Sequence, residues 1–256
     1  MNQQQKYILN LQRKSRERKR EQAFVIEGRK MFEEAPADRI KMIVASESFC
    51  KSKEGAALLK GKKFDVVSDS IFETLSDTKT PQGILAIVKR LNYTMNDLMQ
   101  VKNQKAPHLV VLDNLQDPGN LGTILRAGEG AGITGLIMSR DTVDLYNPKV
   151  IRSTMGSVFR VPFYYTDDLE QTVLDLKARG IRVFAAHLAG KNNYEQEDYT
   201  GNTAFLIGNE GNGLTEKLSN LADTWVKIPM AGKVESLNAA IAASILMFET
   251  ARQRRA

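Results

Sequence analysis

Cysteine and histidine are scarce in this sequence. Its 256 residues include one cysteine and two histidines. A single thiol, Cys50, cannot form an intramolecular disulfide bond, so a disulfide-stabilised scaffold is excluded. So few cysteine and histidine side chains cannot build a zinc site of the Cys/His kind either, and we predict no bound metal. A chain of this length can instead be stabilised by a hydrophobic core.

Long hydrophobic runs are missing as well. No stretch reaches the roughly 18 apolar residues of a helix that spans a bilayer. Residues 1–20 are polar and basic, without the apolar segment of a secretion signal. With 42% hydrophobic and 26% charged residues, the composition is that of a soluble globular protein. We therefore expect a cytoplasmic protein with no membrane partner.

Acidic residues are outnumbered by basic ones, 30 to 36, which gives a net charge of +6. This balance favours a polyanionic partner such as RNA, although many soluble proteins are mildly basic. The positive charge is concentrated in residues 13–20, RKSRERKR, within a predicted helix over residues 3–22. The run is either a solvated helix face or a surface that contacts RNA.

The first part of the chain is predicted to be a compact α/β module. Short apolar strands alternate with helical segments there. The predicted strands are residues 24–28, 40–44, 64–67 and 83–88, and the predicted helices are a segment that ends before Pro36, residues 51–60 and residues 70–75. We assign residues 1–95 to an N-terminal RNA-binding domain and the polar residues 96–107 to a linker.

The remaining residues, 108–256, have the pattern of an open, mainly parallel sheet with helices on both faces. The apolar run at 108–112 is typical of a buried parallel strand. A glycine-rich turn, a helix at 121–130 and a strand at 134–138 complete a βαβ unit. Further strands are predicted at 161–164, 181–185, 204–207 and 225–227, and further helices at 168–179 and 236–252.

The first segment with a chemical signature is DNLQDPGNLGTILRAGEGAG, residues 113–132. It follows a strand and opens a helix, where α/β proteins bind ligands. The glycine spacing is neither that of a dinucleotide-binding fold nor that of a P-loop. Asn120 can cap the helix. Arg126, among small residues near the helix start, is suited either to gripping a phosphate or to an ordinary surface salt bridge.

The second segment is FLIGNEGNGL, residues 205–214. A buried strand leads directly into three glycines, with Glu210 among them. Glycines permit positive φ angles and expose the backbone, so such a loop can hydrogen-bond an adenine edge or ribose hydroxyls. The alternative is an ordinary turn between a strand and a helix.

The third segment is VKIPMAGKVESLNAAIAASILMFE, residues 226–249. A strand ends in Ile-Pro-Met, and Ser236 starts a helix that is apolar nearly all round and is therefore predicted to be buried. The helix is either a C-terminal core helix capped by Ser236 or a helix that packs in its own subunit and against a second copy of the chain.

In this order, the three segments resemble motifs 1, 2 and 3 of the SpoU/TrmH family, within the SPOUT superfamily of RNA methyltransferases. The matching sequences are NLGTILRA at 120–127, IGNEGNGL at 207–214, and IPM and SLN within 228–238. The loop at 151–163, with Arg152 and Ser153, resembles the family's substrate-side loop. The N-terminal module is similar to the family's ribosomal-protein-like RNA-binding domain.

The resemblance implies a fold and a reaction. The C-terminal strands are expected to form a deep trefoil knot, and the C-terminal SPOUT domain is expected to form a homodimer. The cofactor is expected to be S-adenosyl-L-methionine (SAM), held by Gly208, Ile228 and Leu237. The expected reaction transfers its methyl group to a ribose 2′-OH of structured RNA, with rRNA favoured over tRNA because a separate N-terminal module is typical of the rRNA enzymes.

The resemblance also implies a catalytic set. Arg126 is the expected catalytic residue, and Asn120, Glu210, Ser236 and Asn238 complete the set. A neutral arginine base is hard to accept because the guanidinium pKa exceeds 12. We therefore expect Arg126 to hold the phosphate beside the ribose and to lower the pKa of the hydroxyl, with the phosphate or a water taking the proton. Glu210 is expected to orient Arg126 or a substrate hydroxyl.

Other functions remain open at this point. A non-catalytic RNA-binding protein would explain the basic first helix, but binding alone would not require Arg126 and Glu210. Methylation of a base instead of a ribose is also compatible with the superfamily. A nucleotide-dependent oxidoreductase would need a glycine fingerprint and a ribose-binding acid, which the sequence lacks. His187 ends a predicted strand and is interpreted as structural.

Overall fold

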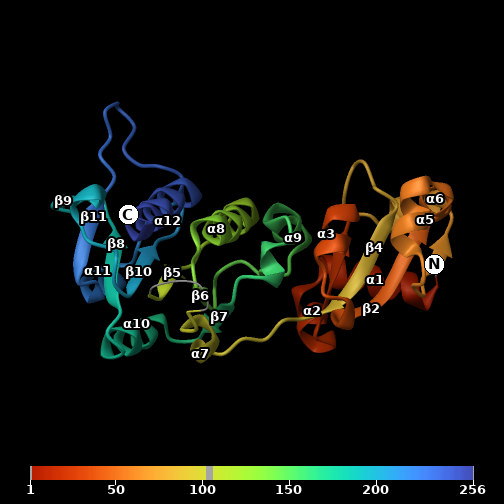
Figure 1. Ribbon diagram of the computed structural model, residues 1–256, viewed down its shortest axis with the longest axis horizontal. Helices are drawn as coiled ribbons and strands as arrows, with labels where there is room; N and C mark the ends of the chain where they lie inside the picture. Colours follow the sequence, from red (N-terminus) through yellow and green to blue (C-terminus); the bar gives the residue numbers. More distant parts are fainter. Residues whose placement is uncertain (1, 102–105, 256) are drawn as a thin grey trace. The chain divides into compact units, whose positions relative to one another are not determined.

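The computed structural model describes residues 2–101 and 106–255 and divides into two compact units (Figure 1). The first unit contains the residues up to Leu91 together with Asp144–Phe159, and the second contains Asn92–Val143 and Arg160–Ala256. The predicted division at 96–107 places 144–159 in the second domain, whereas these residues pack in the first unit. Residues 102–105 of the predicted linker lie outside the described residues.

The first unit is built on a four-stranded sheet in the order β1-β4-β2-β3. Its strands are β1 (Ala23–Glu27), β2 (Ile40–Ser46), β3 (Asp65–Val67) and β4 (Ile84–Lys89). The helices are α1 (Gln3–Arg13), α2 (Ser15–Glu21), α3 (Arg29–Glu34), α4 (Glu47–Lys51), α5 (Lys53–Leu59), α6 (Asp69–Leu75) and α9 (Pro148–Thr154). Side chains from α1, α6 and the strands form its core, including Leu11, Phe72 and Ile87. The predicted α/β module is confirmed.

The prediction of one helix over residues 3–22 is wrong, because the chain is extended at Lys14 (φ −124°, ψ 112°) between α1 and α2. Arg18 explains the break. Its Nη1 donates hydrogen bonds to the carbonyls of Leu11 (2.7 Å) and Gln12 (2.9 Å), in the last turn of α1 where the helix offers no partner. Its Nη2 also pairs with Asp144 at 2.7 Å. One cation of the basic run is therefore a buried structural group.

The predicted helix at 51–60 is confirmed as α5, which begins two residues later than predicted. The separate short helix α4 ends at Lys51, and Ser52 lies between the two. The Ser52 hydroxyl accepts a hydrogen bond from the backbone N–H of Gly55 (2.9 Å), and it therefore caps the start of α5.

The second unit is built on a seven-stranded sheet in the order β7-β6-β5-β10-β8-β11-β9. Every pair of neighbouring strands in it is parallel. The strands are β5 (His108–Leu112), β6 (Gly135–Ser139), β7 (Phe163–Thr166), β8 (Arg182–Ala186), β9 (Asn192–Asn193), β10 (Thr203–Ile207) and β11 (Thr224–Lys227). The predicted parallel sheet is confirmed, and β9 is an addition to it.

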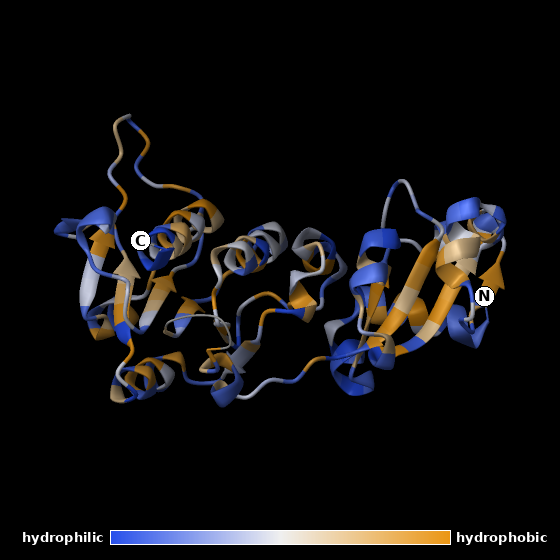
Figure 2. Cartoon of the chain, in the orientation of Figure 1, coloured by the Kyte–Doolittle hydropathy of each residue, from blue (hydrophilic) through white to orange (hydrophobic). Residues whose placement is uncertain are grey.

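Helices cover both faces of this sheet, as predicted. They are α7 (Met95–Leu98), α8 (Pro118–Ala131), α10 (Leu169–Ala178), α11 (Glu216–Leu221) and α12 (Ala239–Arg255). Helices α8 and α12 pack against each other on one face, while α7, α10 and α11 contribute Leu98, Leu176 and Leu218 to the core on the other (Figure 1). Figure 2 shows the apolar strands between these more polar helices. Within the described ranges, no helix is long and apolar enough to cross a membrane.

Helix α12 is anchored at its C-terminal end by a buried arginine. Arg254 is 8% exposed. Its guanidinium donates to four backbone carbonyls, those of Ala106 (2.6 Å), Pro107 (3.0 Å), Tyr199 (3.1 Å) and Gly201 (2.6 Å). Burial lowers the pKa of Arg254 from its ordinary value, but the four acceptors stabilise the cation. One side chain thereby joins α12 to the segments before β5 and β10.

We predict that Arg254→Met lowers the free energy of unfolding by about 3 kcal/mol or more, because four carbonyls lose their donor at once. Arg255→Met is the matched control, since Arg255 lies on the same helix but is exposed. Urea unfolding monitored by circular dichroism measures both variants. Equal stability of the two variants would contradict the anchoring role.

Candidate active site

The three sequence motifs meet at the carboxyl edge of the seven-stranded sheet. Strands β5 and β10 are parallel neighbours, with Leu112 paired to Ile207. The segment after β5 leads to α8, and the segment after β10 is the glycine loop at 208–213. The loop after β11, residues 228–238, leads to α12. The topology therefore brings together segments that are separated by about a hundred residues in the sequence.

The glycine loop is a tight backbone turn. Asn209 and Gly213 exchange two backbone hydrogen bonds, of 3.0 and 2.9 Å. A Cβ atom on Gly208 would lie 2.1 Å from the carbonyl carbon of Gly213 and 2.2 Å from the nitrogen of Leu214. Only glycine fits at position 208, because no other residue lets the two backbone segments approach so closely.

Asn209 organises this loop, although the sequence interpretation gave it no role. Its Oδ1 accepts from the backbone N–H groups of Gly211 (2.8 Å) and Asn212 (3.3 Å). Its Nδ2 donates to the carbonyl of Asn114 at 2.7 Å, which joins the glycine loop to the segment after β5. The signal in the sequence is the asparagine two residues before a glycine, an arrangement in which an Asn side chain commonly bonds the backbone ahead of it.

Glu210, Asn120 and Asn238 form a hydrogen-bonded chain across the three motifs. The Glu210 carboxylate accepts from Nδ2 of Asn120 (3.0 Å) and from the backbone N–H groups of Gln116 (3.1 Å) and Asp117 (2.9 Å). Nδ2 of Asn238 donates in turn to Oδ1 of Asn120 at 2.9 Å. Each motif contributes one member of the chain, so the three loops are held in one arrangement.

The environment of Glu210 favours its ionised form. Burial alone would raise the pKa of this carboxyl, but the hydrogen bonds from Asn120 and from the backbone of Gln116 and Asp117 outweigh it. The pKa of Glu210 therefore lies below its ordinary value. At neutral pH the carboxylate is charged and accepts three hydrogen bonds.

A cavity of about 420 Å³ lies beside the glycine loop. Its size is that of a small-molecule site. The predicted cofactor residues Gly208, Ile228 and Leu237 all line it, together with Glu210 and Ser236 of the predicted catalytic set. The rest of the lining comes from the ends of β8 and β11, the glycine loop and the first residues of α12: Ala186, His187, Leu188, Ile207, Asn209, Gly211, Asn212, Gly213, Leu214, Val226, Lys227, Met230, Glu235, Ala239 and Ala242.

His187 lies at the rim of this cavity against Trp225, with ring centroids 4.2 Å apart. Its Nδ1 accepts a hydrogen bond from the backbone N–H of Ala189 at 3.1 Å. The ring helps to fix the turn after β8 and also lines the cavity, so its interpretation as structural stays a prediction.

Arg126 stands apart from this network. It lies on the exposed face of α8, and among the described residues its side chain makes no hydrogen bond or ion pair. Glu210 contacts α8 through Asn120 and not through Arg126, so of its two expected roles the structure does not show the contact with Arg126, and orientation of a substrate hydroxyl stays a prediction. Since no acidic side chain of the described residues pairs with this exposed guanidinium, the guanidinium is available to bind an anion.

The two predicted helix caps are wrong by a few residues. Asp117, not Asn120, caps α8, since its Oδ1 accepts from the backbone N–H of Asn120 at 2.8 Å. Asn238, not Ser236, caps α12, which begins at Ala239. Asn120 instead uses its side-chain amide to join the motifs, and Asn238 donates to Asn120 in addition to capping α12. Residues 236–238 are consequently a loop at the cavity and not the first turn of a helix.

No group of three or more His, Cys, Asp or Glu side chains in the described part of the chain is arranged to hold a metal ion. The site therefore combines a cavity beside the glycine loop, the hydrogen-bonded network around Glu210, and Arg126, which has no acidic partner within the described residues.

Comparison with known proteins identifies the family. Residues 107–248 match the SpoU rRNA methylase family, and residues 2–86 match the MRM3-like substrate binding domain. The chain is 32% identical to the 23S rRNA (guanosine(2553)-2′-O)-methyltransferase RlmP of Bacillus subtilis over 236 residues, which cover 91% of this chain and 90% of the relative.

Solved structures give the same result. The SpoU methyltransferase AviRb from Streptomyces viridochromogenes, in complex with AdoMet, is 27% identical with a TM-score of 0.89 and covers 100% of this chain and 99% of its own. An AdoMet-bound rRNA methyltransferase from Sinorhizobium meliloti is 33% identical with a TM-score of 0.83, over 98% and 95%. The chain therefore belongs to the SpoU rRNA methylase family. The predicted class of enzyme, a SAM-dependent RNA 2′-O-methyltransferase, is confirmed.

We predict that Gly208→Ala lowers the affinity for SAM at least about tenfold, because the added methyl group would force apart the backbone that lines the cavity. Gly211→Ala is the matched control in the same loop, where a Cβ would meet only Oδ1 of Asn209, at 3.5 Å. Isothermal titration calorimetry with SAM measures both. Equal affinities would show that the loop does not shape the cofactor site.

Proposed function

We propose that this protein methylates the 2′-OH of a ribose in ribosomal RNA and that the motif residues of the second unit carry the reaction. The observation that supports this most directly is the position of Gly208, Ile228 and Leu237 around one cavity, at the edge where Asn120, Glu210 and Asn238 join the three motifs. Family membership gives the reaction class, and these contacts support the proposed choice of residues.

The cavity fits SAM in its chemistry. Gly208 leaves its backbone without a side chain, and residues of the glycine loop and of 228–237 line the cavity, where backbone groups can hydrogen-bond an adenine and a ribose. Gly208, Ile228 and Leu237 would hold the cofactor. SAM supplies an electrophilic methyl group on its sulfonium, so the protein's task is to position the ribose hydroxyl and assist removal of its proton.

Arg126 holds the phosphate next to the target ribose. Its guanidinium is exposed and has no acidic partner among the described residues, and a fixed positive charge beside a 2′-OH lowers the pKa of that hydroxyl. The proton passes to the phosphate or to water. Glu210 and Asn120 act by holding the start of α8, while Ser236 and Asn238 shape the loop that meets the ribose.

Ribosomal RNA is favoured over transfer RNA as the substrate. The relative RlmP, which methylates 23S rRNA, is matched over nine-tenths of both chains, so the resemblance includes the N-terminal unit. That unit matches a substrate-binding domain, which gives it a role in choosing the RNA. An enzyme acting in this way would work in the cytoplasm, where ribosomes are assembled.

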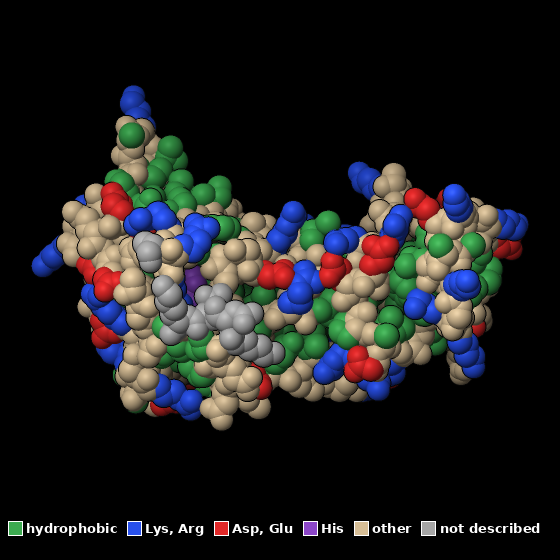
Figure 3. Space-filling view, viewed as in Figure 1, with side chains coloured by type: hydrophobic (Ala, Val, Ile, Leu, Met, Phe, Trp, Pro, Cys, Tyr) green, Lys and Arg blue, Asp and Glu red, His purple; other side chains and the backbone are tan. Residues whose placement is uncertain are grey.

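The active form is a homodimer joined through the second unit. Helix α12 buries Ala240, Ala243 and Leu246 within the chain but leaves Ile241 52% and Phe248 46% exposed. Figure 3 shows hydrophobic side chains gathered in the region of α12 and the loop before it. A second copy of the chain would cover this surface, because large exposed apolar side chains on one helix favour association. The trefoil knot implied by the resemblance stays a prediction.

We predict that Arg126→Ala reduces methyl transfer by at least about a hundredfold while SAM affinity stays within a few-fold, because Arg126 lies outside the cavity lining. Arg140→Ala is the control, an arginine in a surface pair with Asp167 in which both side chains are 72% exposed. Transfer of labelled methyl groups to unmodified rRNA measures activity. Full activity of Arg126→Ala would remove this residue from the mechanism.

The basic run contributes phosphate contacts. Lys14, Arg16 and Lys19 are exposed, whereas Arg18 is buried and Arg20 pairs with Glu17 and Glu21. We predict that replacing Lys14, Arg16 and Lys19 with Ala weakens rRNA binding. The slope of log affinity against log salt concentration should also decrease in magnitude by about two to three, because about three phosphate contacts are lost. Arg20→Ala, measured in the same filter-binding series, serves as control. An unchanged slope in the triple variant would show that these three residues do not contact RNA.

A further inference from the structure

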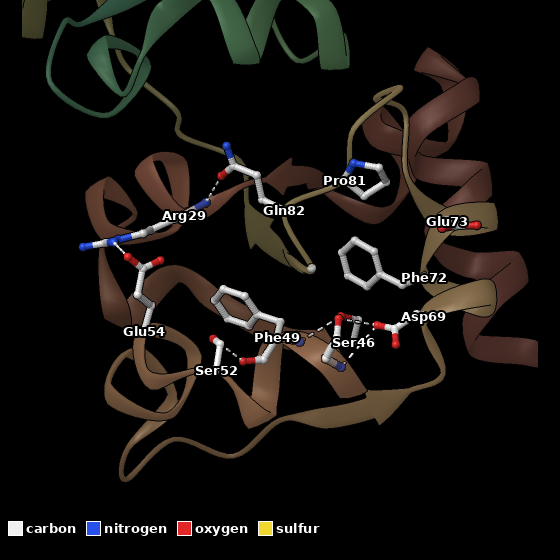
Figure 4. A pocket seen from close by; sticks show the side chains of 12 residues that line it. Arg29, Ser46, Phe49, Ser52, Glu54, Asp69, Phe72, Glu73, Pro81 and Gln82 are labelled. Carbon is white, nitrogen blue, oxygen red and sulfur yellow. Dashed lines mark hydrogen bonds and ion pairs between the residues drawn. The ribbon is translucent and has the colours of Figure 1, made fainter.

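A second cavity, of about 540 Å³, lies in the first unit at one end of the four-stranded sheet (Figure 4). It is formed where β2 ends and β4 begins, close to the starts of α3, α4, α5 and α6. Its lining residues are Arg29, Ser46, Ser48, Phe49, Ser52, Glu54, Asp69, Phe72, Glu73, Pro81, Gln82 and Gly83. None of them belongs to the methyltransferase motifs.

The cavity is built by a close approach of two segments. The backbone N–H of Ser46 donates to the carbonyl of Gly83 at 2.9 Å. Gly83 has φ +77°, and a Cβ atom on it would lie 2.6 Å from Cβ of Phe49 and 2.8 Å from Oγ of Ser46. A side chain at position 83 would therefore both strain the backbone and push Phe49 away.

Flat apolar side chains form part of the wall. Figure 4 shows the rings of Phe49, Phe72 and Pro81 turned toward the same central space. Phe72 is 1% exposed and fixed in the core, whereas Phe49 is only partly buried. These surfaces suit a planar aromatic ligand, because aromatic rings attract one another in offset-stacked or edge-to-face arrangements.

The Asp69 carboxylate lies at the edge of the cavity. Its Oδ1 accepts the backbone N–H (3.2 Å) and the hydroxyl (2.6 Å) of Ser48. Both hydrogen bonds use Oδ1, and no side chain or backbone group of the described residues is recorded as a donor to Oδ2. Hydrogen bonds from Ser48 and Ser46 lower the pKa of Asp69, so the group is ionised at neutral pH and acts only as an acceptor.

The charges around the cavity disfavour a phosphate. Three carboxylates line it, those of Glu54, Asp69 and Glu73, against one cation. That cation, Arg29, is already paired with Glu54 at 3.2 Å and with Glu33 at 2.8 Å. A neutral planar group that offers N–H donors fits this balance, and an anion does not.

We propose that this cavity binds one unpaired base of the RNA substrate, with the base against Phe49 and an amino or imino N–H donated to Asp69. The inference rests on the proposed function in taking RNA as the substrate. Proteins commonly read single-stranded RNA by stacking a splayed base on an aromatic side chain and bonding its edge. The match of residues 2–86 to a substrate-binding domain favours RNA over a small metabolite as the occupant.

Base preference follows from Asp69. Guanine, adenine and cytosine each present an amino group, which a carboxylate accepts. Uracil presents one N–H between two carbonyl oxygens, and these repel a carboxylate. Cytidine, adenosine and guanosine hexanucleotides should therefore compete for the full-length protein better than uridine hexanucleotide, and Asp69→Asn should reduce the difference.

The test measures binding of a radiolabelled, unmodified 23S rRNA transcript to the full-length protein. Phe49→Leu keeps an apolar side chain but removes the ring, and Asp69→Asn keeps the acceptor for Ser48 but removes the charge. Each should weaken binding about five- to tenfold, with KM for RNA raised and kcat at saturating RNA unchanged. The controls Phe64→Leu and Asp38→Asn, outside the cavity, should stay within twofold. Thermal melting establishes that all four variants fold.

Ultraviolet cross-linking of the same complex separates this inference from the proposed function, because it does not depend on catalysis. Nucleotide adducts on the peptide that contains Phe49, lost in Phe49→Leu, would support the base site even if no RNA were methylated. Normal methylation without such adducts, and with both cavity variants binding as the wild type does, would overturn the base site and leave the proposed function intact.

Discussion

The close backbone contact at Gly208 is the constraint on which the active site depends. The backbone at Gly208 lies so close to the backbone of Gly213 and Leu214 that no Cβ atom fits between them. The loop can therefore neither carry a side chain at position 208 nor easily change its conformation there. Because the loop is fixed, the Glu210 carboxylate reaches the backbone at the start of α8 and the amide of Asn120. A site assembled from three distant segments needs such a fixed point, since small displacements of positioned groups reduce reaction rates strongly.

Helix α8 lies between the glycine loop and the exposed Arg126. Its first residues are held by Glu210, and its outer face presents Arg126. Its other side packs against α12, which Arg254 anchors to the segments before β5 and β10. The position of the exposed arginine is therefore set by the same hydrogen bonds that close the loop beside the cavity. In the proposed mechanism, this helix would couple the cofactor cavity to the arginine that holds the ribose phosphate.

Much of this arrangement could be predicted from the sequence. Apolar runs such as 108–112 and 204–207 identified the parallel strands, and the motifs identified Gly208, Ile228 and Leu237 as neighbours of one cavity. The errors have a common cause. Asn120 and Ser236 were interpreted as helix caps because local sequence favours them, but Asp117 and Asn238 take those positions while Asn120 bonds across motifs.

Long-range partners account for the other differences. The break at Lys14 depends on Arg18, which bonds the end of α1 and an aspartate more than a hundred residues away. Residues 144–159 pack with the first unit although the sequence around them continues the second domain. The cavity around Phe49 and Asp69 lies in a module whose sequence motifs are weak, so only the folded chain brings its lining together.

The most direct test of the central claim is incubation of the protein with labelled SAM and unmodified bacterial RNA, followed by separation of the RNA by size and nucleoside analysis. Label in a 2′-O-methyl nucleoside of ribosomal RNA is the predicted result, and label confined to a methylated base or to transfer RNA would contradict it.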